Sequence, residues 1–203
     1  MVFVFVVINY ACNSSTNTKQ QLKDEEIYEK STGNVSARQD TTKNSRQQMI
    51  EDMLNAPMSG FADKDWADLM IIHHRTTQRL ADFEFARGQH LTVARTAERI
   101  ANKDNKEILT FKSFSLKFKP IDKLDSFKVE ISQVIKSMSD TVPSIGSVDN
   151  RFIDLMIKHQ ETAIEISKVY LKYTHDAKIK VIAQNIILNS QKEIPKLKSI
   201  KPD

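Results

Sequence analysis

The sequence predicts an all-α protein: a four-helix bundle built from two repeated helix pairs, with a short N-terminal helix and a connecting helix. Three observations support this prediction. Only 4 glycines and 5 prolines occur in 203 residues, so helix-breaking residues are scarce. Long stretches place apolar residues three and four positions apart, which is the spacing of one helix face. The chain also repeats itself.

The repeat emerges when the sequence is shifted by 86 residues, from Asp68 to Asp154. Residues 66–108 and 152–194 then agree at 11 of 43 positions without a gap. The densest agreement pairs "DLMIIHH" (68–74) with "DLMIKHQ" (154–160). One helix pair cannot bury its apolar faces, whereas two pairs packed together can. We therefore expect a bundle with pseudo-twofold symmetry between repeats at about 63–117 and 149–198.

The first residues predict export. The apolar run "MVFVFVVINYA" ends in Ala11 and precedes Cys12, which is the only cysteine of the sequence. This order is typical of a bacterial lipoprotein signal, residues 1–12, that is cleaved before Cys12 so that the thiol carries lipid. No Lys or Arg precedes the run, and Asn9 stands where Leu is usual. An export signal without lipid and an incidental apolar N-terminus therefore stay open as alternatives.

The rest of the chain divides into a tether and a helical domain. Residues 13–44 are polar and poor in apolar side chains, which predicts a disordered tether. Residues 45–203 hold the bundle domain. We expect helices at 45–56, 63–87, 91–117, 123–140, 149–172 and 176–198, with Gly88 ending the second and Pro195 interrupting the last.

The charge distribution argues against nucleic-acid binding. The formal net charge is only +4, and basic residues are mixed with acidic ones along the chain. No stretch alternates basic with aromatic side chains. A solvated surface is the simpler interpretation, and attraction to anionic lipid stays open.

The repeated turn suggests a metal site. Residues three apart on a helix are neighbours, so Met70 lies beside His73, and Met156 lies beside His159. We expect these four side chains to face each other across the pseudo-twofold axis, with His74 able to add or replace a ligand. Imidazole and thioether groups suit copper, and Cu(I) in particular accepts soft sulfur. The alternative is that the methionines fill the core and each inward histidine is hydrogen-bonded within it.

Motifs of enzymes are missing from the sequence. A ferritin-like di-iron site needs Glu-x-x-His pairs, and the chain has none. There is likewise no His-Glu-x-x-His zinc helix, no Gly-rich phosphate loop and no nucleophile elbow. We therefore expect a binding protein and no enzymatic activity.

Two segments, "DKDWADLMIIHHRTTQRLAD" and "VDNRFIDLMIKHQETAIEIS", resemble the domain-of-unknown-function 305 family. The resemblance covers about residues 63–198. It implies a ferritin-like four-helix architecture and export, and it implies copper binding through Met and His in some members. The chain departs from the family pattern at Gln160, where the second His of the pair is usual. It also has Asp104 and Ser190 where the later helix usually carries Gln.

Together these features predict an exported, lipid-anchored bundle of the cell envelope, at the periplasm or the outer surface. It would bind a transition-metal ion for sequestration or handover, and copper is the ion that we expect. Its expected partners are the ion and, through Cys12, a membrane. Two alternatives remain: a structural or interaction module of the envelope that holds no metal, and an oxidoreductase with an unrecognised di-metal centre.

Overall fold

The computed structural model describes residues 41–117, 125–138 and 146–200. The chain divides into a unit of residues 1–39 and a unit of residues 40–203, and every described residue belongs to the second. Cys12, the signal over residues 1–12 and nearly all of the tether predicted at 13–44 lie outside the described residues. The last four residues of that tether are helical, because the first described helix begins at Thr41.

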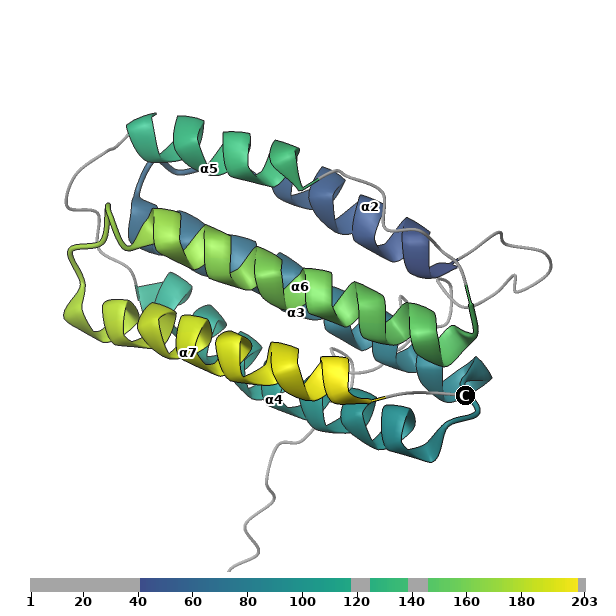
Figure 1. Ribbon diagram of the computed structural model, residues 1–203. Coiled ribbons are helices and arrows are strands. Elements are labelled where there is room, and N and C mark those ends of the chain that lie inside the picture. Colours follow the sequence, from purple (N-terminus) through teal and green to yellow (C-terminus); the bar gives the residue numbers. More distant parts are fainter. Residues whose placement is uncertain (1–40, 118–124, 139–145, 201–203) are drawn as a thin grey trace, which may run out of the picture. The chain divides into compact units, whose positions relative to one another are not determined.

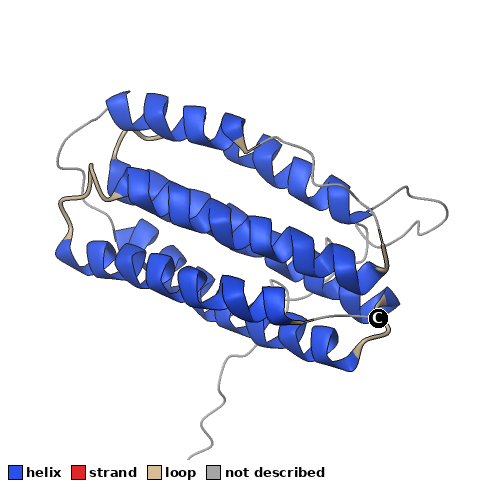
Figure 2. Ribbon diagram, viewed as in Figure 1, coloured by secondary structure: helices blue, strands red, loops and turns tan. Residues whose placement is uncertain are grey.

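Six helices make up the described part of the chain, and it contains no strand. Their bounds are α2 Thr41–Leu54, α3 Ala62–Arg87, α4 Leu91–Lys117, α5 Asp125–Ser137, α6 Val148–Tyr170 and α7 Ala177–Ser199. The all-α prediction is confirmed, and each expected helix is present with bounds shifted by a few residues (Figure 2).

The ends of the helices follow from local chemistry. Ser147 and Asp176 cap α6 and α7, because their side chains accept hydrogen bonds from backbone N–H groups of the first turn. Gly60 and Gly146 precede α3 and α6 with φ of 86° and 105°, a left-handed backbone that favours glycine. These two glycines are 86 residues apart, so the repeat extends to the turns that start its helices.

Two expectations about helix ends need correction. Gly88 does end α3, but with φ of −70° and not in the left-handed conformation. A side chain at this position would instead collide with Glu84. Pro195 does not interrupt α7, which continues to Ser199. Proline leaves the carbonyl four residues earlier without its donor, and here that residue is the exposed Gln191, whose carbonyl water can reach.

The helices form three layers (Figure 1). The central layer is the antiparallel pair α3 and α6. Trp66 of α3 stacks on Tyr170 of α6 at one end of this pair, with ring centroids 4.4 Å apart, and the α3–α4 loop meets Asp149 at the other end. On one side α4 packs against α3 and α7 against α6, whereas on the other side α2 and α5 cover the central pair. The short helix and the connecting helix therefore pair with each other as a third layer of the bundle.

The core consists of two apolar clusters with a buried polar layer between them. The first cluster gathers around Trp66, Phe111 and Tyr170, and includes Met49 and Met53 of α2. The second gathers around Leu80, Val93 and Phe152. Between these positions, α3, α4, α6 and α7 contribute buried polar side chains: His73, His74, Thr77, Asp104, His159, Gln160 and Ser190. This layer is where the candidate functional site lies.

Candidate metal centre

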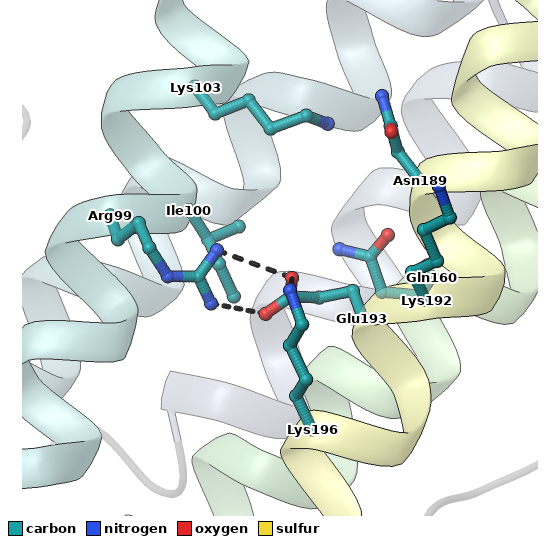
Figure 3. Close-up of a pocket in the computed structure, with 8 residues that line it drawn as sticks. All are labelled: Arg99, Ile100, Lys103, Gln160, Asn189, Lys192, Glu193 and Lys196. Atoms are coloured by element: carbon teal, nitrogen blue, oxygen red, sulfur yellow. Dashed lines mark hydrogen bonds and ion pairs between the residues drawn. The ribbon is translucent and has the colours of Figure 1, made fainter.

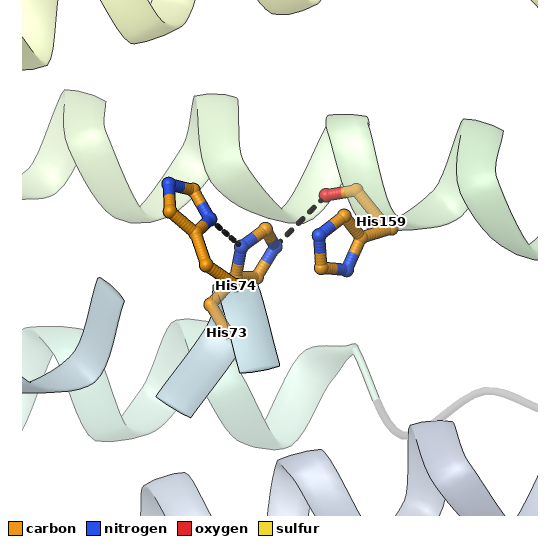
Figure 4. A group of neighbouring side chains, drawn as sticks. All are labelled: His73, His74 and His159. Carbon is orange, nitrogen blue, oxygen red and sulfur yellow. Dashed lines mark hydrogen bonds between the residues drawn. The ribbon is translucent and has the colours of Figure 1, made fainter. Parts of the chain in front are cut away.

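Three histidines meet at the middle of the α3–α6 pair (Figure 4). His73 and His74 come from α3 and His159 comes from α6, and their exposed fractions are 1%, 3% and 2%. A nitrogen from each ring lies within 4.8 Å of the others. The antiparallel packing produces this meeting, because the repeated turns cross near their histidines.

The two ring nitrogens of His73 differ: one donates a hydrogen bond, and the other carries no hydrogen. Its Nε2 lies 3.1 Å from the backbone oxygen of His159, and since a carbonyl only accepts, Nε2 carries the hydrogen. Burial, and then the neighbouring His74, hold the pKa of His73 well below its usual value, so the ring is neutral near pH 7. The Nδ1 atom of a neutral ring protonated at Nε2 offers a lone pair.

That lone pair faces His74. The two Nδ1 atoms are 3.2 Å apart. On its other side, His74 Nε2 lies 2.9 Å from Glu107 Oε2, close enough for electrostatic attraction, although the angles are not those of a hydrogen bond. If Nε2 holds its proton toward Glu107, a neutral His74 presents a second lone pair to His73. Two lone pairs at this distance repel each other unless a cation, either a proton or a metal ion, lies between them.

His159 supplies the third ring of the cluster. Its Nε2 lies 2.8 Å from Thr77 Oγ1, and the Thr77 hydroxyl donates to Asp104 at 2.6 Å. With the hydroxyl hydrogen used, Nε2 of His159 must be the donor to Thr77. Its Nδ1 is then a bare nitrogen, and it is buried with no hydrogen-bond partner. Burial, and then His73 and His74, hold the pKa of His159 well below its usual value, so this ring is also neutral.

Two carboxylates from α4 complete the surroundings. Asp104 and Glu107 form a second group with His74 whose ligand atoms lie within 4.8 Å of one another. Burial raises the pKa of Asp104, although His74 and the Thr77 hydroxyl act in the opposite direction. Burial also works to raise the pKa of Glu107, but the contact with His74 and the ion pair with Lys103 lower it overall. A cation in this group would be stabilised by both carboxylates.

The structure brings together only part of the residue set predicted from the sequence. His73, His74 and His159 meet as described, whereas the methionines do not. Met70 belongs to the first apolar cluster and Met156 to the second, so they are not neighbours. In an antiparallel pair, residues that precede the crossing point on each helix lie on opposite sides of it. The two methionines are therefore not packed together, and the structure gives no support for the expectation that Met70 and Met156 share one ion.

Neither Asp104 nor Glu107 is among the ligands predicted from the sequence. The spacing of Asp104 and Glu107, three residues apart on a helix, places both on one face. Asp104 also occupies a position where the other repeat has Ser190 and where the resembled family usually has Gln. A carboxylate at an inward-facing helix position, where the other repeat has a neutral residue, is the sequence feature that could have indicated a metal site.

The second repeat carries a neutral version of the same arrangement. Gln160 replaces His74, Ser190 replaces Asp104, and the Ser190 hydroxyl donates to Gln160 Oε1 at 2.6 Å. The two halves of the bundle therefore share a backbone plan but differ in chemistry, and the His74–Asp104 pair occurs in the first half only.

Comparison with known proteins identifies the family. The profile of the family described as Domain of unknown function (DUF305) matches residues 13–115 and 135–201. The chain belongs to this family. A solved structure titled "Crystal structure of DUF305 fragment from Deinococcus radiodurans" is similar to this member, with a TM-score of 0.51, 17% sequence identity, and coverage of 70% of this chain and 96% of that one. At this identity the likeness shows the fold only. No curated protein matches the chain.

The membership extends the resemblance seen in the sequence to most of the chain. Within the described part of this DUF305 domain, no helix is both long and apolar enough to cross a membrane. The family description names no activity.

Proposed function

We propose that this DUF305 domain binds one transition-metal ion at His73, His74 and His159, with copper as the first choice of ion. The observation that supports this most strongly is the cluster of three buried imidazoles, with a nitrogen of each ring within 4.8 Å of the others. The His159 ring also has an Nδ1 atom that is buried without a hydrogen-bond partner. Buried polar atoms without a partner are rare in proteins, and an unbound ion is one recognised reason for them.

The distances fit metal ligation. Two nitrogens bound at about 2.0 Å to one tetrahedral ion lie roughly 3.3 Å apart. The Nδ1 atoms of His73 and His74 are separated by 3.2 Å. The bond from His73 Nε2 to the His159 carbonyl acts as the outer partner that orients a ligating imidazole and fixes its tautomer.

Copper is preferred on ligand chemistry. Imidazole nitrogens suit copper, zinc, nickel and iron, and Cu(II) binds such ligands most tightly among the divalent ions of the first row. Because the methionines lie elsewhere, the preference no longer rests on sulfur. Sequestration or handover agrees with the burial of the three rings, which leaves little room for a substrate. We further propose export and a lipid anchor at Cys12, on the sequence features alone.

A structural module of the cell envelope is the competing function. One observation favours it: the rings of His73 and His159 stack with centroids 3.6 Å apart and an interplanar angle of 17°. Stacked rings present their lone pairs side by side, not toward one point. If the protein has this structural function, a proton shared by His73 and His74 stabilises the buried polar layer, and the site holds no metal ion.

A titration distinguishes the two functions. The purified, metal-free chain is titrated anaerobically with Cu(I), and in parallel with Cu(II) and Zn(II), against a chelator of known affinity. We expect one ion per chain, and a loss of affinity of at least about 100-fold in His74→Ala. The matched control is His175→Ala, an exposed histidine outside the site.

Three results would count against the proposal. If the wild-type chain binds no ion, the metal function is wrong. If His74→Ala and His175→Ala bind equally well, an ion binds but at another place. If zinc binds at His74 more tightly than either copper ion, the site stands and the choice of copper is wrong.

A further inference from the structure

A groove runs between α4 and α7 on the side of the central pair away from α2 and α5. It contains two adjoining cavities of about 180 Å³ and about 270 Å³, which share Asn189 in their walls. The Arg99–Glu193 ion pair bridges the two helices across the smaller cavity (Figure 3).

The two cavities are counterparts under the repeat. Each of the following pairs is separated by 86 residues, with one member lining each cavity: Arg99 and Asn185, Ile100 and Ile186, Lys103 and Asn189, Glu107 and Glu193, Thr110 and Lys196. The larger cavity reaches Glu107, which contacts His74 of the candidate metal centre. The smaller cavity lies over the neutral Gln160–Ser190 pair.

The side chains that line the smaller cavity carry more positive than negative charge. Arg99 and Lys103 of α4, and Lys192 and Lys196 of α7, all line it. The single carboxylate of its lining is Glu193, which pairs with Arg99 and lies 3.8 Å from Lys196. Counting Glu107, which pairs with Lys103, still leaves two positive charges in excess.

Neutral donors lie beneath these charges. Gln160 is 7% exposed, and its Oε1 already accepts the Ser190 hydroxyl, which leaves the amide N–H groups to face another acceptor. Figure 3 shows the Gln160 amide between the α4 and α7 side chains that line the cavity. Lys192 has no acidic partner among the residues that the structure describes.

We infer that this cavity binds a small oxyanion, with phosphate as the class it fits best. Lysine ammonium groups and a guanidinium surround a space open to solvent, and an amide contributes neutral donors, which is the combination that recognises phosphate oxygens. Converging like charges in a concave site raise the local concentration of counter-ions. The two cavities that the repeat relates therefore differ in charge: the larger one reaches the candidate metal centre through Glu107, and the smaller one attracts anions.

Inorganic phosphate is the probe that tests this inference. Metal-free protein is titrated with phosphate at constant ionic strength, and amide chemical shifts are followed by NMR. We expect saturable shifts centred on Gln160, Asn189 and Lys192. The double variant Lys192→Gln/Lys196→Gln should bind phosphate about fivefold to tenfold more weakly, while Lys178→Gln/Lys180→Gln, on the same helix outside the cavity, should bind as the wild type does.

A second variant is expected to change affinity in the opposite direction. Glu193→Gln removes the carboxylate that competes with the anion for Arg99 and Lys196, so phosphate should bind about threefold more tightly. Shifts spread over all surface lysines, equal losses in both double variants, or weaker binding by Glu193→Gln would each overturn the inference. Because no metal is present, these results are independent of the proposed metal function.

Discussion

At the residue scale, two acids outside the candidate metal centre, Glu84 and Asp149, have pKa values shifted in opposite directions. Glu84, near the end of α3, is 1% exposed, and neither of its carboxylate oxygens has a donor partner. Asp149, at the start of α6, accepts backbone N–H groups from Gln89 and His90. Burial and then the contact with Asp149 raise the pKa of Glu84 to about 8. Two carboxyl groups in contact share a proton, and here Glu84 holds it.

The repeat explains why this pair exists. Shifted by 86 residues, Glu84 and Asp149 correspond to Tyr170 and Asp63 at the opposite end of the central helix pair. There the Tyr170 hydroxyl donates to Asp63 at 2.5 Å. A protonated Glu84 can therefore donate a hydrogen to Asp149, as the Tyr170 hydroxyl donates to Asp63. An ionised Glu84 has no hydrogen to donate.

Replacing Glu84 by glutamine should make stability less dependent on pH. The pKa of Glu84 is raised in the folded chain, so its stabilising contribution is complete below about pH 4.5 and is lost as pH rises toward about 8. The amide that Glu84→Gln introduces would donate to Asp149 at every pH. We expect the variant to unfold within about 0.5 kcal/mol of the wild type at pH 5, and to be about 1–2 kcal/mol more stable at pH 8.5.

Urea unfolding at the two pH values measures this difference. Because the wild type and the variant share all other titrating groups, the change in their difference reports on Glu84. An equal stability difference at both pH values would show that Glu84 is ionised throughout the range.

At the scale of elements, α2 contributes directly to the core. Met49 and Met53 are 0% and 2% exposed and pack in the same cluster as Trp66. Met58, in the loop that follows, is only partly buried. The three methionines therefore serve packing, and the predicted short helix is needed to close the bundle over the central pair.

A comparison of two methionine variants tests this role of α2. Met53→Ala should lower the free energy of unfolding by about 2–4 kcal/mol, because it removes a fully buried side chain and leaves a cavity. Met58→Ala is the matched control, with an expected loss of less than about 1 kcal/mol, since its side chain stays partly in water. Thermal unfolding followed by circular dichroism measures both. Equal losses would indicate that α2 is not docked on the core as described.

At the scale of the whole molecule, the repeat explains both what the sequence predicts and what it misses. Helix positions follow from apolar periodicity, and the pairing of helices follows from the 86-residue shift. The histidines meet because the repeated turns of α3 and α6 cross close to His73 and His159. Met70 and Met156, one helical turn before that crossing point on each antiparallel helix, lie on opposite sides of it. The sequence does not specify where along the helices the crossing point lies, and therefore it could not distinguish these outcomes.

Two features depend on contacts between segments that sequence periodicity does not reveal. The pairing of α2 with α5 as a third layer requires knowing that both cover the same face of the central pair. The approach of Asp104 and Glu107 to His74 depends on how α4 is rotated about its axis against α3. Neither a local pattern nor the repeat specifies that rotation, because the second copy carries Ser190 and Glu193 with different partners.

The central claim is that the buried histidines, and not the methionines, hold the metal ion. X-ray absorption spectroscopy of the copper-loaded protein tests it most directly. We expect a first shell of nitrogen or oxygen at about 2.0 Å, with the outer-shell scattering of imidazole rings. The spectrum of His175→Ala should be unchanged, and His159→Leu should lose one imidazole contribution. A sulfur shell at about 2.3 Å, or a spectrum that His159→Leu leaves unaltered, would contradict the claim.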